Sequence, residues 1–197
     1  FDPSTFETFL SEQPDLGTGR LGAVVLNSGG ANACTGPDGF ADTHATAEAV
    51  AAALGIGAID VAVCSTGLIG ERLPMPQLLA GIEKAAASLA PTAGDDAARA
   101  IMTTDTVPKT AAVTGDGWTV GGMAKGAGML APGLATMLCV LSTDAVVDPA
   151  GCDAALRSAT ARTFDRVDSD GCMSTNDTVL LLASGGLKAP GTFGQEG

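Results

Sequence analysis

The sequence lacks the residues that several common kinds of site require. It has a single histidine, His44, no C-x-x-C pair among its five cysteines, and no tyrosine. A structural zinc site needs clustered Cys or His ligands, and a Ser/His/Asp triad needs a histidine beside its nucleophile. His44 lies in a segment expected to be helical, away from the polar loops. The sequence therefore predicts no metal site and no bound cofactor.

Cations and long apolar runs are also scarce. Ten Lys and Arg stand against 22 Asp and Glu, which gives a formal net charge of −12. Such a chain repels polyanions, so neither nucleic acid nor an anionic membrane is an expected partner, and solubility alone accounts for the charge. No apolar stretch is long enough to span a bilayer, and no signal-peptide pattern opens the chain. An odd number of scattered cysteines is typical of a reducing cytosol, which predicts a cytoplasmic protein.

Small residues take the place of aromatic ones. The chain has 197 residues, 46% of them hydrophobic, with 27 Gly but only six Phe and one Trp. This composition predicts one globular domain whose core is built from small side chains. The chain begins with Phe1 and ends in a Gly- and Pro-rich stretch, so we expect residues 1–197 to form a single partial domain; a disordered C-terminal tail is the alternative.

Strand-like and helix-like segments alternate along the chain, with one hairpin between them. The hairpin is expected around Asp116-Gly117, a dipeptide typical of tight turns. Other strands are expected at Leu21–Leu26, Ile59–Cys64, Thr136–Leu141 and Thr178–Ala183, with turn residues at Asn27–Asn32. Helices are expected from Asp42 or Thr43 to Leu54, from Pro76 to about Leu89, from Asp95 to near Met102, and, as the longest, from Pro149 onward. The pattern predicts a layered α/β fold with a mixed sheet.

A threonine stands between a Gly- and Pro-rich segment and an apolar strand. This residue, Thr136, follows Ala135 and precedes the run MLCVL. If the bond between Ala135 and Thr136 were cut, the freed α-amine, with a pKa of about 8, could act as the base for the neighbouring hydroxyl. The same hydroxyl could cut the bond by attacking the Ala135 carbonyl. From the residues alone, an ordinary strand position is the favoured interpretation of Thr136.

Two further polar loops, and the start of the loop that leads to Thr136, contain candidate site residues. Thr66 and Gly67 could donate hydrogen bonds to an oxyanion, although the same residues suit a plain turn. Lys125 could meet a carboxylate or be a solvated surface lysine, and Thr103 could bind a ligand or cap a turn.

One acidic motif resembles a calcium loop but fails on register. In Asp168-Ser169-Asp170-Gly171, the glycine fixes the frame of the loop. That frame places Arg166 at the first ligand position and Asp177 at the last, so we exclude a calcium site.

Five ordered motifs resemble the ArgJ-type ornithine acetyltransferases, which are glutamate N-acetyltransferases. The resemblance covers Leu21 to Ser184, and five motifs of this length are far more specific than a lone glycine pattern. They are NSGGANACTG (Asn27–Gly36), VCSTGLIG (Val63–Gly70), IMTTDTVPK (Ile101–Lys109), KGAGMLAPGLATML (Lys125–Leu138) and STNDTVLLLASG (Ser174–Gly185). The family's layered α/β fold agrees with the pattern of elements.

The resemblance implies a self-cleaving enzyme with a threonine nucleophile. Cleavage between Ala135 and Thr136 would leave residues 1–135 in an α subunit and begin a β subunit at residue 136. Thr66 and Gly67 match the oxyanion-hole pair of the family, and Thr103, Lys125 and Thr136 match substrate-binding positions. An acetyl group would pass from N-acetylornithine to Thr136 and then to glutamate. The family also implies heterotetramers of two α and two β chains.

The sequence leaves several alternatives open. Family chains extend beyond both ends of this one, so the rest of the β subunit would be a partner. Acetyl-CoA serves some family members as a second acetyl donor, and this sequence does not distinguish the two kinds. A related self-processing aminopeptidase would use the same kind of nucleophile. An inactive truncated fragment would keep the same motifs.

Overall fold

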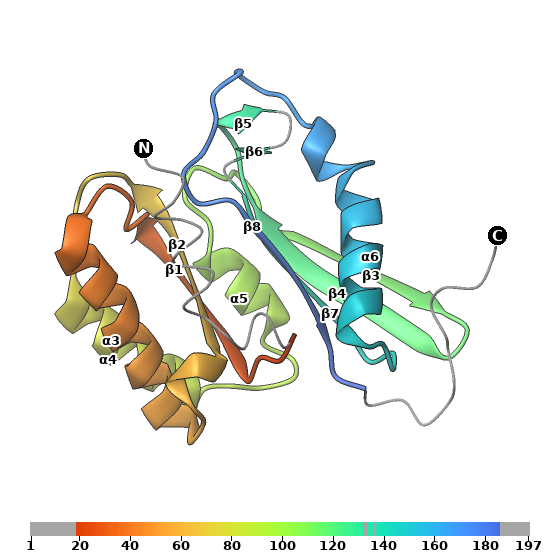
Figure 1. The fold of residues 1–197 in the computed structure, drawn as a ribbon, viewed down its shortest axis with the longest axis horizontal. Coiled ribbons are helices and arrows are strands. Elements are labelled where there is room, and N and C mark those ends of the chain that lie inside the picture. Colours follow the sequence, from red (N-terminus) through yellow and green to blue (C-terminus); the bar gives the residue numbers. More distant parts are fainter. Residues whose placement is uncertain (1–18, 132–133, 136, 186–197) are drawn as a thin grey trace.

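The computed structural model describes residues 19–131, 134–135 and 137–185, which form two layers of strands with helices packed on them (Figure 1). In chain order the elements are β1 (Ala23–Gly30), α3 (Gly36–Leu54), η1 (Ala58–Asp60), β2 (Val61–Leu68), α4 (Met75–Ala87), α5 (Gly94–Ala100), β3 (Lys109–Gly115), β4 (Trp118–Lys125), β5 (Leu130–Ala131), β6 (Leu134–Ala135), β7 (Leu138–Thr143), α6 (Pro149–Thr160), η2 (Phe164–Arg166) and β8 (Thr178–Ala183).

The first layer is a two-stranded parallel sheet covered by α3 and α4 (Figure 1). β1 and β2 pair from Ala23 opposite Val61 onward. The core between this sheet and its helices contains the buried side chains Val50, Ala51, Val61 and Ile82. Because these side chains are small or β-branched, the helices can lie close to the strands.

The second layer is a four-stranded mixed sheet in the order β3-β4-β7-β8. Its first three strands pair antiparallel, while β7 and β8 run parallel and are joined through α6. α5 contacts β3 and β4 from the side of the first layer (Figure 1). The predicted layered α/β fold with a mixed sheet is confirmed, and so is the hairpin around Asp116-Gly117.

The polar residues after the first two strands were expected to form turns, and this prediction was wrong. Asn27 to Gly30 continue β1, where they pair with Ser65 to Leu68 of β2. Gly29 lies opposite Gly67, so two backbones without side chains face each other at this point. The extended pairing takes both polar motifs to the same end of the sheet.

Two expectations about helices also require correction. α3 begins at Gly36, with Pro37 in its first turn, and not at Asp42 or Thr43. Asp42 is buried in mid-helix, where its carboxylate accepts hydrogen bonds from Arg72 Nη2 at 2.7 Å and Nε at 3.0 Å. α3 has 19 residues and α6 only 12, so the helix opened by Pro149 is not the longest.

Other helix boundaries agree more closely with expectation. α3 ends at Leu54 as predicted, because Gly55 adopts the left-handed conformation (φ 70°) that stops a helix. α4 ends at Ala87, near the expected Leu89. Asp95 lies inside the first turn of α5 and does not cap it.

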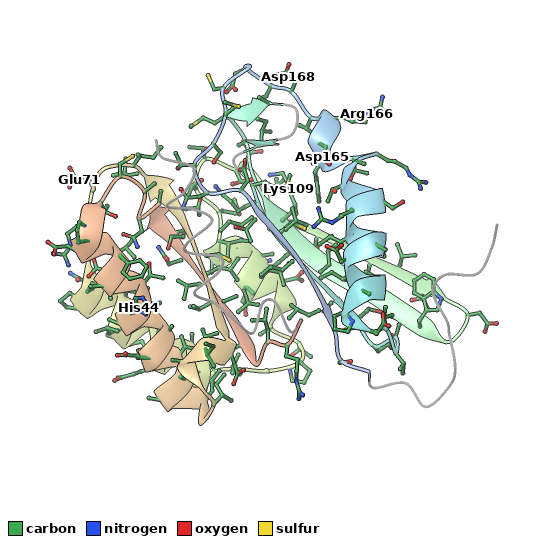
Figure 2. All side chains as sticks on the ribbon, viewed as in Figure 1. His44, Glu71, Lys109, Asp165, Arg166 and Asp168 are labelled. Atoms are coloured by element: carbon green, nitrogen blue, oxygen red, sulfur yellow. The ribbon has the colours of Figure 1, made fainter. Side chains whose placement is uncertain are left out.

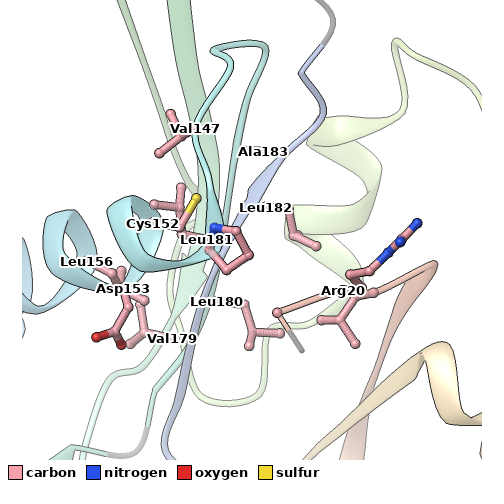
Figure 3. A pocket seen from close by; sticks show the side chains of 13 residues that line it. Arg20, Val147, Cys152, Asp153, Leu156, Val179, Leu180, Leu181, Leu182 and Ala183 are labelled. Carbon is pink, nitrogen blue, oxygen red and sulfur yellow. The ribbon is translucent and has the colours of Figure 1, made fainter. Parts of the chain in front are cut away.

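A cavity of 530 Å³ lies between α6, β8 and the start of the described chain (Figure 3). Its lining includes Leu156 and the strand residues from Val179 to Ala183. It contains none of the site residues that the sequence predicts. None of the helices in the described ranges is both long and apolar enough to cross a membrane.

Candidate active site

A buried hydrogen bond joins the two layers. Lys125, at the end of β4, donates from Nζ to Thr66 Oγ1 of β2 over 2.9 Å. Both residues are buried, with exposed fractions of 3% for Lys125 and 2% for Thr66. Lys125 is therefore not the solvated surface lysine that the sequence also allowed. The Thr66 hydroxyl accepts this bond with its oxygen and keeps its own proton, which it can donate to an oxyanion.

The strand that follows Thr136 lies beside Lys125. In the antiparallel register of β4 and β7, Lys125 faces Leu138. On the other side of β7, Leu138 faces Thr178 of β8. Asp177, one residue before Thr178, accepts a hydrogen bond from the Met137 backbone N–H at 2.9 Å. The residue that directly follows position 136 is thus held by a carboxylate next to Lys125.

Asp105 connects the loop after α5 to the loop after β4. Its side chain is 1% exposed and forms an ion pair with Lys109. Asp105 Oδ1 also accepts from the Gly126 N–H at 2.8 Å, and Oδ2 from the Thr103 N–H at 3.4 Å. One carboxylate therefore fixes Thr103 relative to the residue that follows Lys125.

Gly67 occupies a position that only glycine can take. Its φ is +136°, a backbone conformation that L side chains rarely adopt. A Cβ at this position would lie 2.4 Å from the carbonyl carbon of Gly29. The close approach of the two glycines sets the course of β2 just after Thr66.

The charges of the site are balanced within a buried region. Burial lowers the pKa of Lys125, although the negative charges of Asp105 and Asp177 favour its protonated form. Burial raises the pKa of Asp177, while the hydrogen bond from Met137 N–H acts in the opposite direction. Burial also acts to raise the pKa of Asp105, but bonds from Lys109, Gly126 and Thr103 outweigh it and leave that pKa below its usual value.

One further contact closes the site. The Asn176 side-chain amide donates to the Ala31 carbonyl oxygen at 2.7 Å. This bond ties the loop before β8 to the loop after β1, across 145 positions of sequence. Together with the contacts of Thr66, Asp105 and Asp177, it brings all five motifs into one bonded network.

Of the predicted site residues, the structure brings Thr66, Gly67 and Lys125 together and links Thr103 to them through Asp105. Thr103 itself is exposed. Ala135 lies in β6, a two-residue strand that pairs with β5. Thr136, the predicted nucleophile, lies outside the described residues.

Sequence reasoning missed Asp105 and Asp177 as organising residues. Asp177 immediately precedes the apolar run TVLLLA, and a carboxylate at the start of a buried strand was the available signal. His44 lies on α3 against Phe40, with ring centroids 4.5 Å apart, and in the view of Figure 2 it is on the opposite side of β1 and β2 from the exposed Lys109. Within the described ranges, no three His, Cys, Asp or Glu side chains are grouped to hold a metal ion.

Several known proteins are similar to this chain. The protein named arginine biosynthesis bifunctional protein ArgJ from Mycobacterium leprae is 71% identical over 184 residues, which cover 89% of this chain and 45% of the relative. The protein of the same name from Streptomyces coelicolor is 71% identical over 170 residues, which cover 86% of this chain and 44% of that protein. The chain thus spans about half the length of the curated relatives it matches.

Two solved structures are also similar. Ornithine acetyltransferase from Mycobacterium tuberculosis, solved in complex with ornithine, is 64% identical with a TM-score of 0.54, and the match covers 58% of this chain and 62% of that one. ArgJ from Bacillus halodurans is 41% identical with a TM-score of 0.50, over 58% of this chain and 61% of that one. The ArgJ family model matches residues 9–195, so this chain belongs to the ArgJ family.

Proposed function

We propose that this chain supplies the catalytic centre of an ornithine acetyltransferase in arginine biosynthesis. In this proposal, the acetyl group passes from N-acetylornithine to Thr136 and from there to glutamate. Membership of the ArgJ family supports the activity, and the ornithine bound to the mycobacterial relative supports the substrate class. The observation that carries the proposal is the buried contact of Lys125 with Thr66 beside the strand that follows Thr136.

The first chemical step is self-cleavage. The Thr136 hydroxyl attacks the Ala135 carbonyl carbon, the bond to the Thr136 nitrogen breaks, and that nitrogen takes up the hydroxyl proton. Water then hydrolyses the resulting ester, which leaves an Ala135 carboxylate and a free Thr136 amine and hydroxyl. Residues 1–135 become the end of an α subunit, and residue 136 begins a β subunit.

The second step is acetyl transfer by ping-pong exchange. The Thr136 hydroxyl attacks the acetyl carbonyl of N-acetylornithine, and the neighbouring α-amine takes the hydroxyl proton and passes it to the departing ornithine amine. The acetyl-threonine is then attacked by the amine of glutamate, which releases N-acetylglutamate and restores the hydroxyl. The Thr66 hydroxyl and the Gly67 N–H donate to the oxyanion of each tetrahedral intermediate.

Two residues of the site are proposed to hold the substrates. Lys125 and Thr103 bind the amino-acid part of the substrate, and Asp105 keeps these two positions together. The proposed protein is cytoplasmic and contains two α and two β chains. Each β chain would also include the rest of the β subunit that the family implies. Acetyl-CoA can serve as a second donor only if the same acetyl-threonine forms from it, which a donor assay would decide.

Mass spectrometry tests the cleavage. The full-length protein, incubated at neutral pH, should yield a fragment that begins at Thr136, and a chain that stays intact contradicts the proposal. The Thr136→Ala variant should block cleavage and transfer together, whereas Thr136→Ser, which keeps a hydroxyl, should retain part of both. Acetyl exchange by Thr136→Ala would refute the role of Thr136.

An acceptor assay tests the reaction class. With N-acetylornithine as donor, N-acetylglutamate should form only when glutamate is present. Release of amino acids from peptides without an acceptor would identify a self-processing aminopeptidase instead.

A further inference from the structure

The segment 168–177, between η2 and β8, contacts the backbone on both sides of the proposed cleavage bond. On the side before the bond, Asp170 Oδ2 accepts from the Met129 N–H at 2.8 Å. On the side after it, Asp177 Oδ1 accepts from the Met137 N–H at 2.9 Å. The two carboxylates belong to one stretch of chain, so their spacing fixes the distance between the two backbone segments.

Ser169 adds two bonds on the side before the cleavage bond. Its backbone N–H donates to the Leu130 carbonyl at 2.8 Å, and its Oγ accepts from the Leu130 N–H at 3.4 Å. Leu130 is the strand partner of Ala135, whose carbonyl would be attacked during cleavage. The position of Ala135 therefore depends on a residue that Ser169 holds at both its backbone groups.

The hairpin of β5 and β6 has little to hold it in place by itself. Each strand has two residues, and an isolated hairpin of any length is only marginally stable in water. Met129, at its start, has a φ of +56°, which is uncommon for a residue with a side chain. The bonds from Ser169 and Asp170 supply the ordering that the hairpin lacks.

The same contacts explain the acidic motif that resembles a calcium loop. Asp168 Oδ1 accepts from the Gly171 N–H at 3.0 Å, and Asp170 Oδ1 accepts from the Cys172 N–H at 3.1 Å. Backbone amides thus donate hydrogen bonds to both carboxylates. Acidic residues commonly play this part in loops, and it is not the part of metal ligands. Asp170 accepts in addition from the amide of Met129, which belongs to the hairpin.

We propose that segment 168–177 is a processing clamp that positions the bond between residues 135 and 136 for self-cleavage. Ser169 and Asp170 hold the chain before the bond, and Asp177 holds the chain after it. None of the three needs to touch the reacting atoms, so each is a positioning residue. The inference rests on the proposed function, because it presumes cleavage at this bond.

Cleavage changes the two halves of the clamp differently. Afterwards Met129 and Leu130 belong to one product, and Ser169 and Asp170 to the other, so their contacts become contacts between subunits. Asp177 and Met137 stay in the same product. Loss of Asp170 should therefore slow cleavage and spare transfer by molecules already cut, whereas loss of Asp177 should impair both.

The test compares Asp170→Ala with Asp165→Ala in the full-length protein. Asp165 is exposed on η2, and its replacement by alanine removes the same charge from the same region. The rate at which the fragment beginning at Thr136 appears should fall about tenfold or more in Asp170→Ala, since small displacements of reacting groups cost this much. Asp165→Ala should cleave at the wild-type rate. Acetyl transfer per mole of cleaved protein should match wild type in both variants.

Cleavage of Asp170→Ala at the wild-type rate would overturn the clamp and leave the proposed function intact. Absence of any Thr136 fragment from wild-type protein would overturn both. If thermal unfolding shows that Asp170→Ala does not fold, Asp170→Asn and Ser169→Ala replace it, because each keeps part of the contacts. Slower cleavage by these two variants would support the clamp, and wild-type rates in both would contradict it.

Discussion

Lys125 Nζ donates to Thr66 Oγ1 at 2.9 Å, and this bond connects the end of β4 to β2 in the other layer. The two residues are 59 positions apart in the sequence, and both are buried. A lysine in such a place loses hydration, which is why burial lowers its pKa. Burying an ammonium group costs free energy, and groups with pKa values shifted in this way are concentrated at functional sites.

Replacing Lys125 by methionine should separate its proposed substrate-binding role from its structural one. Lys125→Met keeps the length of the side chain and removes the donor to Thr66. We expect kcat/KM for acetyl transfer to fall by about 10²-fold or more. The unfolding temperature should change little, because methionine carries no charge that must be desolvated, and this offsets the loss of the favourable charge interactions with Asp105 and Asp177. Lys84→Met, at an exposed lysine of α4, is the control and should retain full activity.

Replacing Gly67 by alanine should destabilise the fold. The φ of +136° and the approach of Gly29 C to 2.4 Å both oppose a Cβ. Backbone strain of this kind costs about 1–3 kcal/mol, and the contact with Gly29 adds to it. The free energy of unfolding in urea measures the loss. Gly70→Ala is matched, since Gly70 has φ +84° but nothing within 4 Å of its added Cβ, and it should lose less stability.

Asp105 should contribute stability that disappears in acid. Its folded-state pKa lies below the usual value of about 3.9, despite its burial, because it accepts bonds from Lys109, Gly126 and Thr103. The contribution is therefore complete above the unfolded-state pKa and is lost as pH falls through the lower folded-state pKa. Unfolding temperatures across this pH range should fall more steeply for wild type than for Asp105→Asn.

The control for Asp105 is a carboxylate on the surface. Asp96, whose side chain is 84% exposed, pairs with Arg99 on α5. Exposed ion pairs contribute little, so Asp96→Asn should leave both the unfolding temperature and its pH profile close to wild type. Equal pH profiles for wild type and Asp105→Asn would contradict the role of Asp105.

The buried cysteines should resist alkylation in the folded protein. Burial raises the pKa of Cys64 and of Cys139 to about 11 in each case. At a pH of about 8 the reactive thiolate is therefore scarce at both positions, and access is blocked as well. Cys34 and Cys172 are exposed and should react with iodoacetamide first. Mass spectrometry of peptides from briefly treated protein gives the order of labelling, and early labelling of Cys64 would contradict the buried core.

Segments with strong local signals were predicted well from the sequence. The hairpin around Asp116-Gly117 follows from turn chemistry, and the end of α3 follows from the left-handed conformation of Gly55. The strand Thr178–Ala183 matches its apolar run residue for residue. These features depend on neighbours in the chain, which a sequence displays directly.

Other features depend on partners far away in the chain. Asn27 to Gly30 have the composition of a turn, yet they extend β1 because β2 lies beside them. Asp42 has the character of a helix cap, but Arg72, 30 positions later, takes its carboxylate into mid-helix. In both cases a long-range contact outweighs a local preference.

For the site, the sequence by itself determined five ordered motifs that contain its candidate residues, and it determined that Gly67 can adopt a conformation closed to other residues. Only the tertiary structure decided that Lys125 is buried against Thr66, that Asp105 joins two loops, and that Asp177 holds Met137. The reason is physical: the charge and hydrogen-bonding state of a side chain depend on burial and on partners. Both are set by how two layers of strands meet and not by the order of residues along either one.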